Sequence, residues 1–280
     1  MRYGIPYQGS KNRLAGWITG QLPAADTFVD LFAGGCAVTH AAMLSGKWRQ
    51  FIANDIKVQY PQLFKAAAQG KYRDGGRVVT REEFNAIKGH DAYAATVWSF
   101  GNNMRSYLWS ADKAAVKISA CRMLLAPTFG ERYKYYRQFV NELLSRLPDV
   151  DGYTNLRELE GIGHIGRLAE LESLERLQCL EITGLDYRDV VVPRGATVYA
   201  VPPYANTEGL YVRGFDHEAF YEWLRGVEFP VFVSEYSMPE DFLCVGEKDL
   251  FVHLSATNNR LRRTERLYVH RRFEDYMKRI

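Results

Sequence analysis

The feature that most constrains the fold is a series of short apolar, β-rich segments separated by helix-like stretches. Stretches such as 36–46 and 216–226 have helical character, and the segments between such stretches are bounded by Gly, Pro or Asp. The segments are residues 27–32, 50–55, 179–183, 196–201 and 230–236. Buried strands that alternate with helices are typical of an open α/β sheet with helices on both faces. The sequence therefore predicts an α/β fold.

Two parts of the chain depart from this alternation. Residues 248–255 and 263–270 resemble two strands joined by a long, basic connection, which predicts an antiparallel hairpin. Residues 60–150 are rich in helix formers and in Tyr and Trp, which indicates an inserted helical subdomain.

Apolar residues also recur every three positions in one stretch, at Leu159, Ile162, Ile165, Leu168, Leu171, Leu174, Leu177 and Leu180. A strict spacing of three drifts around a helix axis and cannot keep one buried face. The preferred interpretation is a helix from about 166 to 178 that leads into the next strand. A leucine-rich-repeat turn is the alternative, although the run is too short for a solenoid.

Composition and length place the chain among ordinary globular proteins. It has 280 residues, 47% of them hydrophobic, which is enough to bury a sizeable core. No apolar run approaches the roughly 20 residues of a membrane span, and the N-terminus lacks the apolar region of a signal peptide. Its four cysteines are scattered without a C-x-x-C pair, at Cys36, Cys121, Cys179 and Cys244. We expect a reduced, cytoplasmic protein without a metal site.

Positive charge is concentrated in two blocks, although the net charge is only +3. Residues 101–147 and residues 255–280 each hold eight Lys or Arg against three acids, which makes each block +5. Such blocks suggest a polyanionic partner, because phosphate contacts supply most of the non-specific affinity for nucleic acid. Solvated helix faces are the alternative explanation.

A glycine-rich turn follows the first predicted strand in "DLFAGGCAVTH", residues 30–40. Gly34 and Gly35 would let the backbone approach a ligand where a helix begins. Asp55 ends the next strand, 20 residues after Gly35, where a nucleotide-binding α/β unit places an acid for ribose hydroxyls. The pattern indicates an adenosine-containing cofactor, with a purely structural turn as the alternative. The Walker lysine and the G-x-G-x-x-G spacing are absent, so neither a P-loop nor a standard dinucleotide site is supported.

A second candidate motif is "TGLDYRDV", residues 183–190, where Asp186 and Tyr187 follow a predicted strand. An acid beside an aromatic ring can accept a hydrogen bond from an exocyclic amine while the ring packs on the base. The same pair is also common in surface sequence.

The third candidate is "TVYAVPPYANT", residues 197–207. Pro202 and Pro203 hold the chain extended and present carbonyl acceptors, and an aromatic ring follows at Tyr204. In open α/β sheets the carboxyl ends of strands are where ligands bind, which favours a functional role over a stiff loop.

Together these motifs resemble the Dam-like (D12 class) adenine-N6 DNA methyltransferases, in particular phage-type members. The stretches that carry the resemblance are "YQGSK", "DLFAGGCAVTH", "ANDI", "DY" and "VPPYANT", in the family's order, with "SFGNN" and "SEY" as less specific additions. The resemblance implies a Rossmann-like S-adenosylmethionine-dependent methyltransferase sheet with a C-terminal antiparallel hairpin. Residues 1–59 and 151–280 would form the cofactor-binding catalytic domain, and residues 60–150 the target-recognition insert.

The resemblance also implies where S-adenosylmethionine binds. Its methionine moiety would face Lys11, its ribose hydroxyls would meet Asp55, and its adenine would meet the Asp186–Tyr187 pair. The full set implied for the cofactor is Tyr7, Gly9, Lys11, Phe32, Ala33, Gly34, Gly35, Asp55, Asp186 and Tyr187.

A target adenine would be flipped out of double-stranded DNA, because its amino group cannot be reached inside the stack. Tyr204 would stack on this base. The Pro202 carbonyl would accept one amino hydrogen and the residue before it the other, which aims the nitrogen lone pair at the methyl group. The implied catalytic set is Val201, Pro202, Pro203 and Tyr204.

Position 201 departs from the family, which has D-P-P-Y where this chain has V-P-P-Y. Asp, or the Asn or Ser of other subclasses, accepts a hydrogen bond there, and Val cannot. A buried unsatisfied donor costs roughly 1–3 kcal/mol, and loss of one placed partner removes roughly 10²–10³ in rate. We expect the fold and cofactor site to persist with little or no methyl transfer, unless another acid such as Glu208 takes over.

Two other functions stay open at this point. One is a DNA-binding protein that occupies sites without chemistry, and the other is methylation of cytosine N4 or of RNA. Sequence-specific DNA contacts are expected from Asn and Arg side chains, which pair bidentately with adenine and guanine, while other cations hold phosphates. The candidates are Asn102, Asn103, Arg105, Tyr107, Arg132, Lys134, Tyr135, Arg137, Asn258, Asn259, Arg260, Arg262 and Arg263.

Overall fold

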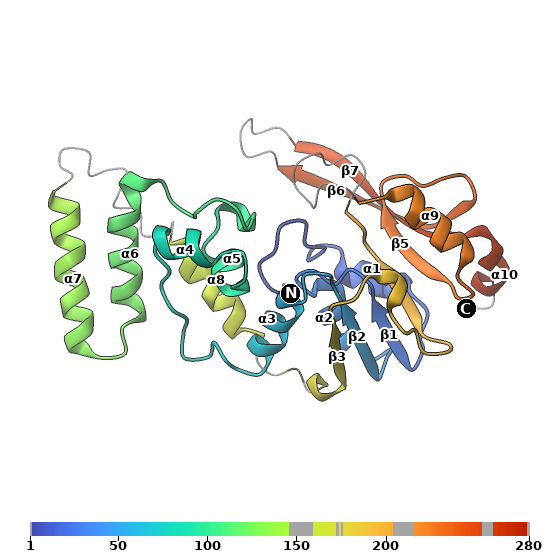
Figure 1. Ribbon diagram of the computed structural model, residues 1–280, viewed down its shortest axis with the longest axis horizontal. Coiled ribbons are helices and arrows are strands. Elements are labelled where there is room, and N and C mark those ends of the chain that lie inside the picture. The colour runs from blue at the N-terminus through green and yellow to red at the C-terminus, as the bar shows by residue number, and fades with distance from the viewer. Residues whose placement is uncertain are drawn as a thin grey trace. The chain divides into compact units, whose positions relative to one another are not determined.

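The computed structural model describes residues 2–145, 159–171, 174, 176–203, 215–253 and 260–278. The chain separates into two compact units (Figure 1). The sheet unit comprises Met1–Gly4, Lys11–Pro61 and Gln178–Ile280, and the helical unit comprises Ile5–Ser10 and Gln62–Leu177.

The sheet unit is built on seven strands in the order β3-β2-β1-β4-β5-β7-β6. The first five are parallel, and β7 runs antiparallel to both β5 and β6. The strands are β1 (Thr27–Asp30), β2 (Gln50–Asn54), β3 (Leu180–Thr183), β4 (Thr197–Ala200), β5 (Val231–Glu235), β6 (Phe242–His253) and β7 (Arg260–His270). The α/β fold, the five predicted strands and the antiparallel hairpin are thus confirmed. The hairpin is longer than predicted, because pairing of β6 with β7 begins at Phe242 and His270.

Helices cover both faces of this sheet. Phe220 and Leu224 of α9 pack against Val198, Val231 and neighbouring strand residues in a buried cluster (Figure 1). The helices of the sheet unit are α1 (Ala15–Gln21), α2 (Ala37–Ser45), α9 (His217–Gly226) and α10 (Glu274–Met277), with α3 (Gln59–Ala68) crossing into the helical unit. The two helices predicted at 36–46 and 216–226 are therefore present.

A buried tryptophan links distant parts of the sheet unit. The Trp48 ring packs on Phe28 of β1 with 5.1 Å between centroids. Its indole nitrogen donates to the Thr197 hydroxyl at 3.1 Å, and that hydroxyl donates to the Pro23 carbonyl at 2.9 Å. The indole nitrogen and the Thr197 hydroxyl thus both have hydrogen-bond partners in a region from which water is excluded.

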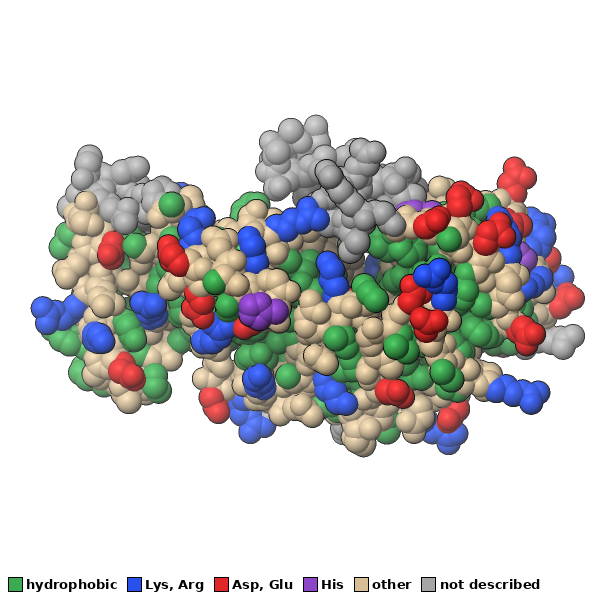
Figure 2. Space-filling view, in the orientation of Figure 1, with side chains coloured by type: hydrophobic (Ala, Val, Ile, Leu, Met, Phe, Trp, Pro, Cys, Tyr) green, Lys and Arg blue, Asp and Glu red, His purple; other side chains and the backbone are tan. Residues whose placement is uncertain are grey.

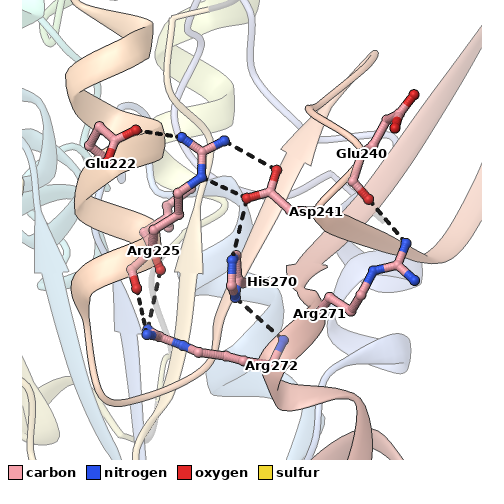
Figure 3. Close-up of polar contacts among 8 residues, drawn as sticks. Glu222, Arg225, Glu240, Asp241, His270, Arg271 and Arg272 are labelled. Atoms are coloured by element: carbon pink, nitrogen blue, oxygen red, sulfur yellow. Dashed lines mark hydrogen bonds and ion pairs between the residues drawn. The ribbon is translucent and has the colours of Figure 1, made fainter.

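Charged side chains tie the end of α9 to the base of the hairpin (Figure 3). Arg225 donates to Asp241 from Nε at 2.6 Å and from a terminal nitrogen at 3.1 Å, and also contacts Glu222. The Arg225 guanidinium holds the pKa of the Asp241 carboxyl below its usual value. Arg272 reaches back to the carbonyls of residues 224 and 225, where α9 ends. Cations at a helix C-terminus satisfy its last carbonyls and complement its dipole.

The helical unit contains only helices and turns among its described residues, apart from one isolated bridge between Ser99 and Tyr107. Its helices are α4 (Arg81–Ile87), α5 (Ala92–Val97), α6 (Ala111–Leu125), α7 (Phe129–Leu144) and α8 (Glu160–Ala169), with a short 3-10 turn at Phe100–Asn102. Several begin at side-chain caps: Thr80, Asp91 and Thr128 each accept a backbone N–H of the first turn. The unit extends to Leu177, beyond the boundary at 150 that composition suggested, because α8 packs against α5.

The helix predicted over 166–178 is wrong in its bounds. The structure places α8 at Glu160–Ala169 and a short 3-10 turn at Leu177–Cys179. Gly161 and Gly163, in the part of this helix that the prediction left out, have low helix propensity. Packing overrides that propensity, because Ile165 and Leu168 on this helix are 3% and 0% exposed.

Two glycines of α8 predict that alanine substitutions at positions 161 and 163 have different effects on stability. A Cβ at Gly161 would lie 3.0 Å from an atom of the Trp98 ring, whereas a Cβ at Gly163 meets nothing within 4 Å. Gly163→Ala should raise the free energy of unfolding by about 0.5–1 kcal/mol. Gly161→Ala should be at least about 1 kcal/mol less stable than Gly163→Ala, because the buried ring cannot yield. Urea unfolding followed by circular dichroism measures both, and equal midpoints would contradict the packing.

Candidate functional site

The turn between β1 and α2 is held by backbone contacts and by unusual dihedral angles. The Ala33 N–H donates to the Asn54 carbonyl at 2.8 Å, and the Cys36 N–H donates to the Ala33 carbonyl at 2.6 Å. Gly34 has φ of 47° and Cys36, at the N-cap of α2, has φ of 57°. Gly4 closes over this turn so tightly that a Cβ there would lie 2.3 Å from the Gly35 carbonyl oxygen. The predicted cofactor loop is therefore a fixed, close-packed turn at the start of a helix.

Asp55 binds directly to this turn. One carboxylate oxygen accepts the Gly34 N–H at 2.8 Å and the other accepts the Lys57 N–H at 2.8 Å. Burial raises the pKa of Asp55, and these two hydrogen bonds oppose the rise. A carboxylate has about four acceptor sites, so both oxygens can still accept from a ligand. The sequence correctly brings Asp55 and Gly34 together.

Ile56 lies beside this carboxylate and was not singled out from the sequence. Its side chain is 67% exposed, although it follows a buried strand. An exposed apolar residue at the carboxyl edge of a parallel sheet offers a surface to a planar ring. Nothing in the sequence separates it from other surface isoleucines.

Asn54 joins three strand ends and was also missed. Its amide donates to the carbonyls of Leu31 and Leu185 at 3.0 and 3.1 Å, and its oxygen accepts from the Thr183 hydroxyl and the Leu185 N–H at 2.8 and 2.9 Å. The side chain is 1% exposed. This residue therefore sets the spacing between the segments that follow β1, β2 and β3.

Asp30, at the end of β1, is a buried acid that sequence inspection passed over. One oxygen accepts the Thr39 hydroxyl at 2.8 Å, and the other has no hydrogen-bond partner among the described residues. Burial is the main cause that raises its pKa to about 7, with a contribution from Asp55. An unpartnered buried oxygen beside the turn suits a donor group of a ligand.

The Asp186–Tyr187 pair follows β3, as predicted, but both side chains have partners. Both Asp186 oxygens accept from the Arg188 guanidinium, at 2.7 and 2.9 Å, and this lowers the Asp186 pKa. The Tyr187 ring is 8% exposed and packs against Phe32 at 5.5 Å and Trp223 at 5.0 Å. The ring thus supports Phe32 from the core of the α9 cluster.

The proline motif directly follows β4. Val201 and Pro203 are half-buried and Pro202 is buried. The Pro203 carbonyl accepts from His217 Nε2 at 2.7 Å, which fixes the loop against the start of α9. Tyr204 and Glu208 lie outside the described residues.

Lys11 lies in a buried ion pair. Its Nζ is 3.0 Å from a Glu265 oxygen, and the two side chains are 8% and 3% exposed. Burial lowers the Lys11 pKa, while Glu265 and Glu235 oppose this. Tyr7 and Gly9, predicted for the same role, belong to the helical unit, in a turn where the Ser10 N–H donates to the Tyr7 carbonyl and Gly9 has φ of 75°.

The candidates for DNA contact differ in how exposed they are. In the helical unit Arg105, Arg132, Lys134 and Arg137 are exposed, although Arg132 also donates to the Ala126 carbonyl at 3.1 Å. Asn103 accepts two backbone N–H groups of its own turn. Figure 2 shows hydrophobic and basic side chains intermixed over the end formed by α6 and α7. Asn258 and Asn259 lie outside the described residues, and the backbone of Arg260, Arg262 and Arg263 is part of β7.

Other cations of the basic blocks hold the fold. Lys117 is only 2% exposed. Arg266 donates to the Tyr236 carbonyl, and Arg271 donates to the Glu240 carbonyl just before the hairpin. Arg272 donates to the Leu224 carbonyl at the end of α9. The charge count of each block therefore overstates the charge available to a polyanion.

The sequence also matches a model of a known family, "D12 class N6 adenine-specific DNA methyltransferase", over residues 7–155. This is more than half of the chain. The chain belongs to this family of DNA methyltransferases. The mixed sheet with its antiparallel end is consistent with a Rossmann-like methyltransferase fold. The match spans the Gly34 turn and most of the helical unit of this methyltransferase, and ends before Asp186 and Val201.

No curated protein sequence matches the methyltransferase. Across the described residues, no helix is long and apolar enough to cross a membrane. Within the same residues, no group of three or more His, Cys, Asp or Glu side chains could hold a metal ion.

Asp30 predicts a pH dependence of stability. An acid whose folded pKa is about 7 stays protonated in the folded state while its unfolded counterpart ionises near pH 4. The unfolded state then binds fewer protons, so the free energy of unfolding falls as pH rises from about 4 to about 7. Asp30→Asn keeps the acceptor for Thr39 and should reduce this fall by at least about 1 kcal/mol. Urea unfolding at pH 5 and pH 8 measures the difference, with exposed Asp189→Asn as control, and an unchanged difference would contradict the assignment.

Proposed function

We propose that this methyltransferase transfers a methyl group from S-adenosylmethionine to the N6 amino group of adenine within a specific sequence of double-stranded DNA. The observation that supports this best is the Gly34 turn held by Asp55, at the carboxyl edge of a methyltransferase-type sheet. A glycine turn, a helix start and an acid after the second strand together suit an adenosine ligand.

The residues at this edge fit the cofactor by their chemistry. Asp55 would accept from the ribose hydroxyls, and the exposed Ile56 would pack on the adenine ring. The unpartnered oxygen of Asp30 would accept from a cationic or hydroxyl group of the ligand. When bound, S-adenosylmethionine supplies the methyl group from its sulfonium.

Asp186 would meet the adenine amino group only by giving up part of its contact with Arg188. This exchange is inexpensive, because exposed ion pairs contribute about 0–1 kcal/mol. Tyr187 would act through Phe32, which it supports, more than through its own buried ring. Lys11, with Glu265, would face the methionine moiety, and Tyr7, Gly9, Ala33 and Gly35 would complete the cofactor set.

DNA would be bound through the exposed cations of the helical unit, with the hairpin connection as a second contact. Arg105, Arg132, Lys134 and Arg137 would contact phosphates or guanine edges. The target adenine would leave the stack, since its amino group is otherwise out of reach. Tyr204 would stack on it, and the Pro202 carbonyl would accept one amino hydrogen.

Ile56 predicts a test of cofactor binding. Ile56→Ala removes apolar surface from the proposed adenine contact and should weaken S-adenosylmethionine binding about 5- to 10-fold. Calorimetric titration of the purified chain measures this affinity. Val191→Ala, which truncates a side chain that is 82% exposed elsewhere on the sheet unit, is the matched control and should leave binding unchanged. Equal affinities of the two variants would remove Ile56 from the site.

Val201 predicts a gain of activity. Val201→Asp restores a side-chain acceptor and should raise the rate of methyl transfer to adenine. The increase should reach about 10²–10³-fold if no other side chain accepts a hydrogen bond from the amino group, and should be smaller if one does. The measurement uses labelled S-adenosylmethionine and unmethylated DNA of mixed sequence, with Val201→Leu as a control that adds no acceptor. If none of the three chains transfers label although all bind the cofactor, a DNA-binding protein without methyl transfer is favoured. Label found in cytosine or in RNA would overturn the adenine assignment.

A further inference from the structure

Glu235 is a buried acid with one unused oxygen at the end of β5. Its side chain is 4% exposed. One oxygen accepts the Tyr236 N–H at 2.8 Å, and the other has no hydrogen-bond partner among the described residues. Leaving a buried acceptor unsatisfied is costly, so the site is stabilised when a donor arrives.

The sheet register places Glu235 beside the proline motif. β4 and β5 are parallel neighbours, and Ala200 pairs with Val233. Continuing this register by two residues puts Glu235 opposite Pro202, on an adjacent strand about 4.8 Å away. The carboxylate and the proline carbonyls therefore belong to the same edge of the sheet.

The surrounding charges leave the second oxygen of Glu235 available. Lys11 pairs with Glu265, which comes from β7. Burial raises the pKa of Glu235 to about 7; Lys11 lowers it and Glu265 raises it further. Burial is the main cause that raises the pKa of Tyr221 of α9 and of Tyr268 of β7, and the charge of Glu235 adds to the rise of both. The second oxygen of Glu235 therefore keeps no hydrogen-bond partner among the described residues.

We propose that Glu235 is the second hydrogen-bond acceptor for the target amino group, the role that a side chain at position 201 would otherwise fill. This inference rests on the proposed function. The amino nitrogen forms a bond to the methyl carbon as the carbon–sulfur bond breaks, and the sulfur keeps that electron pair. The nitrogen then carries a positive charge and releases one proton to the Glu235 carboxylate, which later loses it to solvent. Glu235 is thus a catalytic residue that both orients the amine and takes its proton.

The strand order favours the target amine over the cofactor as the donor that Glu235 meets. The cofactor turn follows β1, and Pro202 follows β4, which separates β1 from β5 in the sheet. Asp30, at the end of β1, already offers an unpartnered oxygen beside the turn. Glu235 lies one strand beyond the prolines, on the side away from the turn.

A double-mutant cycle tests this inference with four chains: the chain as it stands, Glu235→Gln, Val201→Asp and the double variant. Gln keeps the shape and the acceptor for the Tyr236 N–H but can place an N–H₂ group against the amine. In the chain that keeps Val201, Glu235→Gln should lower kcat for adenine about 100-fold. In the Val201→Asp background the loss should be below about 5-fold, because the new acceptor substitutes. Glu247→Gln, on an exposed carboxylate of β6, is the control and should change neither.

Cofactor affinity, measured for each chain, separates the competing explanations. We expect Glu235→Gln to bind S-adenosylmethionine within about 2-fold of the unmodified chain; a loss of binding that matches the loss of rate would overturn the inference in favour of a cofactor contact. If Val201→Asp is active and Glu235→Gln has no effect in either background, the inference fails and the proposed function stands. If no chain labels DNA although all bind the cofactor, the proposed function fails, and the inference with it.

A second variant covers the case in which Glu235→Gln does not fold. Glu235→Asp keeps the carboxylate but withdraws it by one methylene. It should lower kcat about 10-fold in the chain that keeps Val201, with unchanged cofactor affinity. Full activity of Glu235→Asp or of Glu235→Ala would show that the carboxylate position is immaterial and would overturn the assignment.

Discussion

The geometry of the whole site depends on one buried amide. Asn54 makes four hydrogen bonds that join the segments following β1, β2 and β3. Because the side chain is removed from water, each of these bonds would be costly to leave unmade. Asp55 is the next residue, so the position of its carboxylate against Gly34 follows from the amide of Asn54. The turn, the Asp55 carboxylate and the Asp186 loop are thus spaced by a residue that is not among the proposed ligand contacts.

Buried acids are the second constraint on this sheet. Asp30 and Glu235 each have one oxygen without a partner among the described residues, and burial raises the pKa of each to about 7. Both acids lie at carboxyl ends of parallel strands, where helix starts and loops leave room for ligands. Such groups lower the stability of the folded chain when ionised, so the arrangement is understandable if ligands supply the missing donors. Lys11 and Glu265 differ, because they neutralise one another inside the fold.

The number of cations in the two basic blocks is larger than the number available to bind DNA. Arg271 and Arg272 donate to backbone carbonyls beside the hairpin and at the end of α9, and Lys117 is buried. The exposed cations of the helical unit are the ones we propose for contact with DNA. Sequence alone could not separate these classes, because a cation that caps a helix and one that binds phosphate look alike in a list of residues.

The sequence by itself predicted the strands and the hairpin, and it assigned Gly34 and Asp55 to one site, where the structure shows them in contact. Hydrophobic alternation and turn residues are local, and a glycine turn with an acid after the next strand depends only on adjacent parallel strands. Tertiary structure alone decided the bounds of α8, where the Trp98 ring meets Gly161, and the roles of Asn54, Asp30 and Glu235. These roles depend on which distant groups meet after folding. No pattern along the chain shows that a carboxylate oxygen is buried without a donor.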